Sequence, residues 1–249
     1  LAPVTMNVDY DRISQHYDSH RRGGGPYLAR LVELARQCEA SRALEIGSGT
    51  GLNTAAFLEA FPCTLVGLER SAGMLAKARA KELPGLWLQG TASCIPLAAG
   101  SVSFVFGVYV LHHLPELGGT FRECARVLDH GWAVFVTAST DFIRRHPMNA
   151  YFPSFAKVDT ARFQPIEAVI NAFQAAGFRD VGSERFVDAP RPIDAVYVER
   201  VANRFISTYD LIPSDEFEDG VRRLRADVAR TGRLATDIEW ESVAVWARK

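Results

Sequence analysis

The hydrophobic residues in the first three quarters of the chain form short, nearly continuous runs, and segments with helical spacing separate these runs. Continuous apolar runs are typical of parallel strands that are covered on both faces of a sheet. Alternation of such strands with helices, through short links, indicates a parallel sheet with right-handed crossovers. The predicted strands are Arg42–Ile46, Cys63–Leu68, Leu86–Gln89, Ser103–Val108 and Ala133–Thr137.

Helical spacing of apolar residues precedes the first of these strands, from Leu28 to Cys38, and the fifth, from Leu117 to Leu128. The last quarter of the chain has a different pattern. We predict a helix over Pro165–Ala176 that Gly177 ends, then strands at Phe178–Val187 and Ile238–Trp246. A long helical insert separates these two strands, with one helix over Ala195–Ile206 and a second built on the apolar stripe of Phe217, Val221, Leu224 and Val228.

The helical insert is too long for a plain loop, so we interpret it as a lid, together with the less regular stretch Asp141–Gln164. The aromatic residues of these two segments either wall an acceptor pocket or form a core beneath the lid. A chain of 249 residues fits one large α/β domain. We therefore predict a single domain with an N-terminal lid segment (1–25), a core (26–189), the helical insert (190–231) and the final strand (232–249). The aromatic residues in question are Phe142, Tyr151, Phe152, Phe155, Phe205 and Tyr209.

A glycine-rich loop follows the first predicted strand, where Leu44–Gly51 reads Leu-Glu-Ile-Gly-Ser-Gly-Thr-Gly and a helix starts at Leu52. Glycine lets a ligand approach the backbone closely, and a helix start offers free N–H groups. Glu69 ends the second strand, about 20 residues further on, where an acid meets ribose hydroxyls in nucleotide-binding units. This context favours a nucleoside site over a purely structural turn.

Two classes of nucleoside site differ in glycine spacing. Dinucleotide enzymes use G-x-G-x-x-G, whereas this chain has G-x-G-x-G preceded by Glu45, which argues against a nicotinamide dehydrogenase. The segment Glu45–Gly51 resembles the first motif of class I S-adenosylmethionine (SAM)-dependent methyltransferases. The resemblance continues in order over about residues 30–185. It is carried further by Gly67–Ser71 with Met74, Gly90–Leu97, Phe104–Leu114 and Arg122–Gly131.

The resemblance implies a Rossmann-like fold with a mostly parallel seven-stranded sheet, helices on both faces and helical lid inserts. It implies SAM as cofactor and S-adenosylhomocysteine as product. The glycine loop would line the methionine part, Glu45 would hold a water or the amine, and Glu69 would take the ribose hydroxyls. Threonine stands at 91 where the family commonly has aspartate, and an uncharged hydroxyl is a weaker acceptor. The implied cofactor residues are Glu45, Gly47, Ser48, Gly49, Gly51, Glu69, Arg70, Met74, Thr91, Ala92, Gly107, Val108, Tyr17 and Arg21.

Candidate residues for the methyl acceptor lie just past the fourth strand and near the N-terminus. His112 and His113 are candidates for a general base, and the alternative is that both are ordinary loop residues. Tyr10 and Tyr17 are seven residues apart, so on one helix they share a face. They either contact the cofactor or acceptor, or simply pack this segment onto the domain. Arg21 either pairs with the SAM carboxylate or is solvated.

Composition narrows the choice of partner. The net charge is −1, from 28 basic and 29 acidic residues, so we expect no nucleic-acid partner. No apolar run reaches the roughly 20 residues that span a bilayer, so we expect no membrane segment. The four cysteines include no C-x-x-C pair, so we expect no metal site and buried or half-buried thiols in a reducing cytoplasm.

These features predict a cytoplasmic methyltransferase, monomeric or homodimeric, that acts on a small, partly apolar molecule. The acceptor atom of the methyl group can be an oxygen, a nitrogen or a carbon. Two alternatives stay open: a SAM-binding regulatory or non-catalytic partner protein, because binding alone does not prove turnover, and a macromolecular methyltransferase.

Overall fold

The computed structural model describes residues 8–249, which form two compact units. The first, here called the sheet unit, contains Asp9–Thr137, Pro165–Phe186 and Ser242–Lys249. The second, the helical unit, contains Val8, Ala138–Gln164 and Val187–Glu241. No helix in this described part is both long and apolar enough to cross a membrane.

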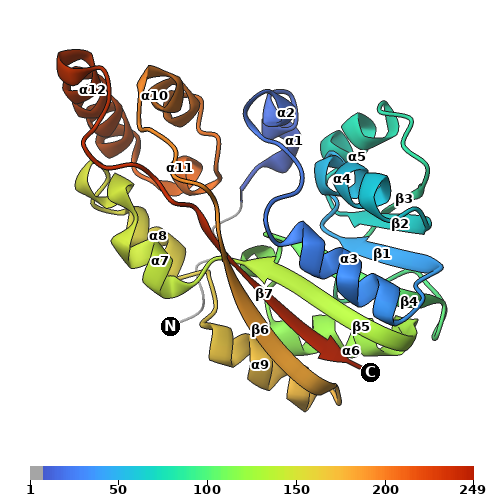
Figure 1. The fold of residues 1–249 in the computed structure, drawn as a ribbon. Coiled ribbons are helices and arrows are strands. Elements are labelled where there is room, and N and C mark those ends of the chain that lie inside the picture. Colours follow the sequence, from blue (N-terminus) through green and yellow to red (C-terminus); the bar gives the residue numbers. More distant parts are fainter. Residues whose placement is uncertain (1–7) are drawn as a thin grey trace. The chain divides into compact units, whose positions relative to one another are not determined.

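The sheet has seven strands within the described residues, in the order β3-β2-β1-β4-β5-β7-β6 (Figure 1). Neighbours among β1 to β5 pair in parallel, and β7 pairs antiparallel with β5. The predicted α/β fold with a mostly parallel seven-stranded sheet is thus confirmed. The strands are β1 (Arg42–Ile46), β2 (Thr64–Glu69), β3 (Leu86–Gln89), β4 (Val102–Val108), β5 (Leu128–Thr137), β6 (Arg179–Val187) and β7 (Glu241–Arg248).

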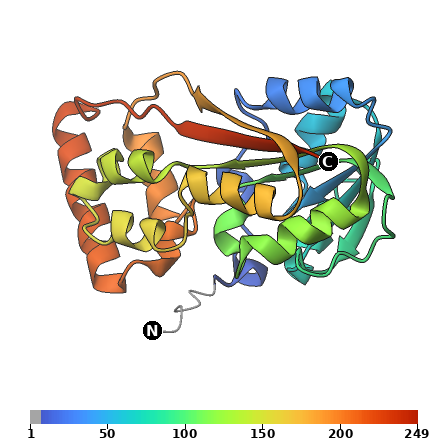
Figure 2. The same cartoon turned by 90° about the horizontal axis from the view of Figure 1, so that it is seen from below.

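Helices cover both faces of this sheet, as Figure 2 shows for α3 (Leu28–Gln37) on one side and for α6 (Leu117–Val127) and α9 (Ile166–Ala175) on the other. On the first face, Phe57 of α4 (Leu52–Ala60) stacks on Phe104 of β4 at 5.8 Å between ring centroids. On the other face α6 and α9 meet through stacked phenylalanines at 3.9 Å. Burial on both sides explains why the strands read as continuous apolar runs.

Strand β5 is longer than its apolar run predicted, because it begins at Leu128 rather than Ala133. The added residues are partly polar, so they carry no strand signal. Gly131 allows this extension: its φ is +101°, and a Cβ there would lie 2.2 Å from the Ser103 carbonyl oxygen. Only glycine permits that approach.

Two helical predictions need correction, and so does one for the cysteines. Helix α10 (Ala195–Ala202) ends before the predicted Ile206. The stretch predicted as irregular holds three short helices, namely α7 (Thr140–Arg145), the 3-10 helix η2 (Pro147–Ala150) and α8 (Phe155–Thr160). Cys94 is exposed rather than buried, because it lies in the tight turn that follows β3; it and the other three cysteines are free thiols.

The helical unit has a hydrophobic core of its own, built mainly from η2, α8, α10, α11 (Thr208–Leu211) and α12 (Ser214–Thr231). The predicted stripe of α12 is confirmed, since all four of its apolar residues are buried. Tyr209 is the centre of an aromatic cluster, 5.3 Å from the ring of Phe152 and 5.8 Å from that of Phe217. Phe152, Phe155 and Tyr209 are at most 2% exposed, so they form core within this unit.

Candidate functional site

The glycine loop connects β1 to α4 in the sheet unit and has a left-handed backbone at all three glycines, with φ of +70°, +54° and +81° at Gly47, Gly49 and Gly51. The amides of Gly47 and Ser48 donate to the Leu68 carbonyl, at 2.8 and 3.1 Å, which fixes the loop to the end of β2. A Cβ on Gly47 would lie 2.4 Å from Val110, whereas one on Gly49 would meet nothing within 4 Å. The backbone of Gly49 therefore borders open space that a ligand can occupy.

Glu69 lies at the end of β2 and faces this loop. The Gly49 amide donates to its Oε2 at 3.0 Å, and the amides of Arg70 and Ser71 both donate to its Oε1 at 2.8 Å. Backbone donors of two different loops thus hold the carboxylate in one orientation. Because the side chain is only half-buried, the carboxylate retains lone pairs for further donors. It is a fixed, accessible acceptor beside the glycine loop.

Glu45, on β1, is fully buried. The Thr54 hydroxyl of α4 donates to its Oε2, and its Oε1 has no hydrogen-bond partner within residues 8–249. Burial raises the pKa of Glu45 to about 8; the Thr54 hydrogen bond opposes this rise and the charge of Glu69 adds to it. The buried Ser48 hydroxyl likewise lacks a partner in the described part. Two buried polar atoms without a hydrogen-bond partner therefore lie in the β1–loop segment, where native proteins usually satisfy such atoms.

The N-terminal segment Asp9–His20, here called the strap, contacts the loops that follow three strands. Tyr10 Oη lies 2.7 Å from Nε2 of His113, after β4. Asp11 accepts from the Ser71 hydroxyl at 2.5 Å and from the Gly73 amide at 2.8 Å, at the start of α5 (Ala72–Arg79), which follows β2. Loops at the carboxyl ends of parallel strands are where ligands bind in open α/β sheets. The strap therefore covers the edge of the sheet that carries the glycine loop.

A third contact joins the strap to the glycine loop itself. Asp18 accepts from the Thr50 hydroxyl at 2.5 Å and pairs with Lys81 at 2.7 Å. Lys81 also donates to the Thr50 carbonyl at 2.5 Å. Sequence reasoning missed Asp11, Asp18 and Lys81. The signal for the two aspartates was their place in the predicted N-terminal lid segment, and Lys81 had none.

The prediction that Tyr10 and Tyr17 share one helical face is wrong. The strap contains two short helices, α1 (Tyr10–Ile13) and α2 (Tyr17–His20). The Ser14 hydroxyl donates back to the Asp11 carbonyl at 2.7 Å, an alternative to continued helix that short polar side chains favour. Contacts of the two halves with different loops then hold them apart. Arg21 lies 4.2 Å over the Tyr17 ring and donates to its hydroxyl at 2.6 Å.

The two candidate histidines lie in the 3-10 helix η1 (Leu111–His113) directly after β4. Both are half-buried, and their ring centroids are 3.9 Å apart. The ring of His113 meets Tyr10 edge-on at 5.0 Å. The structure thus brings His113 to the strap and the same edge of the sheet as the glycine loop.

Six further residues that the resemblance implies for the cofactor lie at, or shortly after, the ends of β2, β3 and β4. Arg70 and Thr91 are exposed, and the Thr91 hydroxyl is 3.4 Å from that of Ser93. Met74 is 1% exposed and Ala92 7%, so both contribute mainly core surface with little area for a ligand. Gly107 and Val108 are buried in β4, opposite Phe135 and Val136 of β5.

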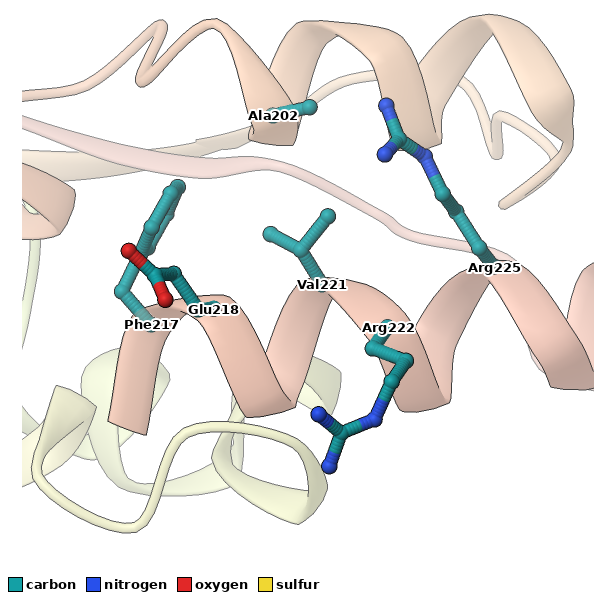
Figure 3. A pocket seen from close by; sticks show the side chains of 6 residues that line it. All are labelled: Ala202, Phe217, Glu218, Val221, Arg222 and Arg225. Carbon is teal, nitrogen blue, oxygen red and sulfur yellow. The ribbon is translucent and has the colours of Figure 1, made fainter. Parts of the chain in front are cut away.

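A separate groove lies within the helical unit, between α10 and α12 (Figure 3). Figure 3 shows Phe217, Val221 and Arg225 on the side of α12 that faces Ala202, and Arg222 turned away. Both arginines are in ion pairs, Arg222 with Asp219 and Arg225 with Glu199. None of the candidate residues from the sequence lines this groove. Over the described range 8–249, no group of three or more His, Cys, Asp or Glu side chains is arranged to hold a metal ion.

Comparison with known proteins gives one matching family model, described as a methyltransferase domain, over residues 44–136. The chain is 33% identical over 139 residues to the biotin biosynthesis bifunctional protein BioHC of Cellvibrio japonicus, covering 52% of this chain and 28% of that protein. It is 26% identical over 190 residues to a malonyl-[acyl-carrier protein] O-methyltransferase of Herminiimonas arsenicoxydans, covering 73% and 70%.

Among solved structures, the fold resembles a putative methyltransferase from an antibiotic biosynthesis pathway of Anabaena variabilis. The TM-score is 0.70 at 23% identity, and the match covers 87% of this chain and 95% of that one.

Proposed function

The chain belongs to the class I SAM-dependent methyltransferase superfamily, and we propose from this premise that it transfers the methyl group of SAM to a small, partly apolar acceptor. The single observation that carries the proposal is the cradle formed by Gly49 and Glu69. There, a left-handed glycine borders open space and a carboxylate is held beside it by three backbone amides. A nucleoside with a ribose diol and a charged amino-acid tail suits such a cradle, because it needs both acceptors and a close backbone approach.

SAM is the cofactor of this superfamily, and when bound it supplies an electrophilic methyl group on a sulfonium. The residues of the chain then have to bind SAM and the acceptor, orient them toward each other and exclude water. Glu69 would accept from the ribose hydroxyls, and Gly47 to Gly49 would border the methionine part. Arg70 and Ala92 would contact the adenine from the loops after β2 and β3.

We further propose an oxygen of a small carboxylic acid as the acceptor. Support comes from the relative that is named a malonyl-[acyl-carrier protein] O-methyltransferase, because a malonyl group carries a free carboxylate whose oxygen can accept a methyl group. A carboxylate is already deprotonated at neutral pH, so its methylation needs no general base. His113 would then orient the acceptor with Tyr10 rather than remove a proton.

Two other functions compete with this proposal. A protein that binds SAM without turnover would have the same cradle, and only a product assay separates it from an enzyme. The other is a macromolecular methyltransferase; of its possible substrates, nucleic acids are disfavoured by the near-neutral charge of the chain, because a basic surface usually binds them.

Calorimetry followed by a product assay tests the proposed function. We expect the purified protein to bind both SAM and S-adenosylhomocysteine, and to form S-adenosylhomocysteine from SAM only when a suitable acid is added. The screen compares short dicarboxylic acids and their thioesters with matched amides, which keep the shape and lack the ionised oxygen. Binding without product for any acceptor class supports the non-catalytic alternative. Turnover of amines or phenols in place of acids contradicts the carboxylate assignment.

Hydrogen exchange tests whether the strap and the 190–231 insert close over the cofactor. Methyl transfer needs a dry, ordered pocket, so both segments should gain protection when S-adenosylhomocysteine binds. The Gly23–Gly25 run is the proposed hinge, because glycine tolerates large backbone changes. Asp18→Asn weakens the contact to Lys81 and should reduce the protection of Tyr10–His20. Glu59→Gln, at an exposed position of α4, is the matched control. Protection confined to the glycine loop and strand ends would show that neither segment is a lid.

A further inference from the structure

Glu45 occupies a buried position that disfavours the charged form of its side chain. Its neighbours across the sheet are Gly67 of β2 and Phe106 of β4, neither of which offers a side-chain donor. From α4, packed against β1, only the Thr54 hydroxyl reaches the carboxyl group. A fully buried carboxylate needs a cation or several donors to stay ionised, since the interior solvates charge poorly.

The charged surroundings of Glu45 do not supply such a cation. The ionisable side chain that acts on it is Glu69, at the end of the neighbouring strand, and its charge has the same sign. In the described part of the chain Glu45 forms no ion pair with lysine, arginine or histidine, on β1, β2, β4 or α4. Two carboxylates near one another in a site of low dielectric constant disfavour double ionisation. The buried member of the pair therefore carries the proton.

We propose that Glu45 is protonated in the ligand-free protein and releases this proton when the ammonium group of SAM binds beside the glycine loop. This inference rests on the proposed function, because it takes SAM as the ligand. The Oε–H bond of Glu45 breaks, the proton passes to solvent, and the resulting carboxylate pairs with the ammonium. Cofactor binding and proton release are then one linked event, and affinity for SAM depends on pH through a residue that solvent does not reach.

The unsatisfied atoms of the site fit this assignment. Oε1 of Glu45 has no partner in residues 8–249, and Glu45 directly precedes Ile46 and the open loop at Gly47–Gly49. A cationic N–H donor placed at Oε1 would satisfy it with a charge-assisted hydrogen bond, which is stronger than a neutral one. Thr54 would keep Oε2 in place in both protonation states.

The raised pKa of Glu45 fixes the direction of the pH dependence. With a pKa of about 8 in the folded protein, the carboxyl group is mostly protonated at neutral pH, whereas in the unfolded chain it is ionised. The folded state thus binds more protons than the unfolded state between pH 4.5 and 8. Stability of the ligand-free protein is therefore lost as pH rises across this window.

Calorimetric titration of SAM at pH 7, in buffers with different enthalpies of ionisation, measures the protons released on binding. We expect about one more proton per SAM for the wild type than for Glu45→Gln, which has no proton to release. S-adenosylhomocysteine keeps the ammonium and should give the same difference. From pH 6 to 7 the association constant of the wild type should rise about tenfold more than that of the variant.

Each outcome has a distinct meaning. SAM binding with equal proton release by wild type and Glu45→Gln overturns the inference and leaves the proposed function standing. A difference with SAM but none with S-adenosylhomocysteine overturns the assignment to the ammonium. Failure of the wild type to bind SAM contradicts the proposed function itself.

The ligand-free protein provides a second readout that is independent of SAM. The Tm of Glu45→Gln should rise relative to that of the wild type as pH increases from 5 to 8, because the variant has no carboxyl group to ionise. A constant difference in Tm overturns the inference. If Glu45→Gln does not fold, Thr54→Val replaces it. This variant removes the hydroxyl that favours the ionised form, so proton release should shift to higher pH, and an unshifted profile overturns the inference.

Discussion

Glu69→Ala should lower the affinity for SAM tenfold or more while leaving the fold intact. The substitution removes charge-assisted hydrogen bonds to the ribose, each worth roughly 1.5–3 kcal/mol. It also removes the acceptor that holds the amides of Gly49, Arg70 and Ser71, so the loop loses part of its order before the ligand arrives. Isothermal calorimetry with SAM measures the loss directly.

Two further variants make this measurement specific. Glu69→Gln retains the shape and one acceptor oxygen without the charge, so its affinity should lie between those of the wild type and Glu69→Ala. Glu59→Ala, at an exposed glutamate of α4, removes a charge from the same unit and should leave affinity unchanged. Wild-type affinity in Glu69→Ala would disprove the ribose assignment.

Gly49→Val should abolish SAM binding. The φ of +54° at Gly49 is costly for any residue with a Cβ, by about 1–2 kcal/mol, and a β-branched side chain suits it least. A Cβ at this position meets no protein atom within 4 Å, so the valine would project into the open space assigned to the cofactor. Calorimetry measures binding, and circular dichroism checks that the variant remains folded.

Gly177→Val is the matched control for this loss. Gly177 also has a positive φ, +88°, and open space around its Cβ position, but it lies in the turn between α9 and β6. Both variants carry similar backbone strain, and only Gly49→Val places a side chain at the glycine loop. Equal loss of SAM binding in both would trace the effect to strain, and retained binding in Gly49→Val would make the loop merely structural.

Most strands were predictable because their signal is local. Strands β1 and β3 match their predicted bounds, β4 begins one residue earlier than predicted, and β2 is shifted by one residue at each end. Continuous apolar runs bounded by glycine or polar residues carry this information within a few positions. Strand β5 was predicted too short because its first residues include Asp129 and His130, whose place in the sheet depends on Gly131 approaching the neighbouring strand.

The candidate site was predictable to the extent that it follows the carboxyl ends of parallel strands. The alternating glycines and Glu69 are separated by about 20 residues in the sequence, a spacing that the strand–loop–helix unit brings together. The Gly49 amide indeed donates to Glu69. Their roles toward SAM stay predictions, as do those of the other proposed cofactor residues.

The sequence by itself determined the class of fold, the position of the glycine loop and the apolar stripe of α12, because each depends on the spacing of residues that are close together in the chain. Only the tertiary structure decided which distant groups meet. It breaks the strap into two helices, brings Asp18 to Thr50 and Lys81, and buries Phe152, Phe155 and Tyr209 in a core of the helical unit. It also buries Glu45 completely, with Thr54 as its hydrogen-bond donor. Such contacts join residues that are far apart in the chain, so the spacing of neighbouring residues does not predict them.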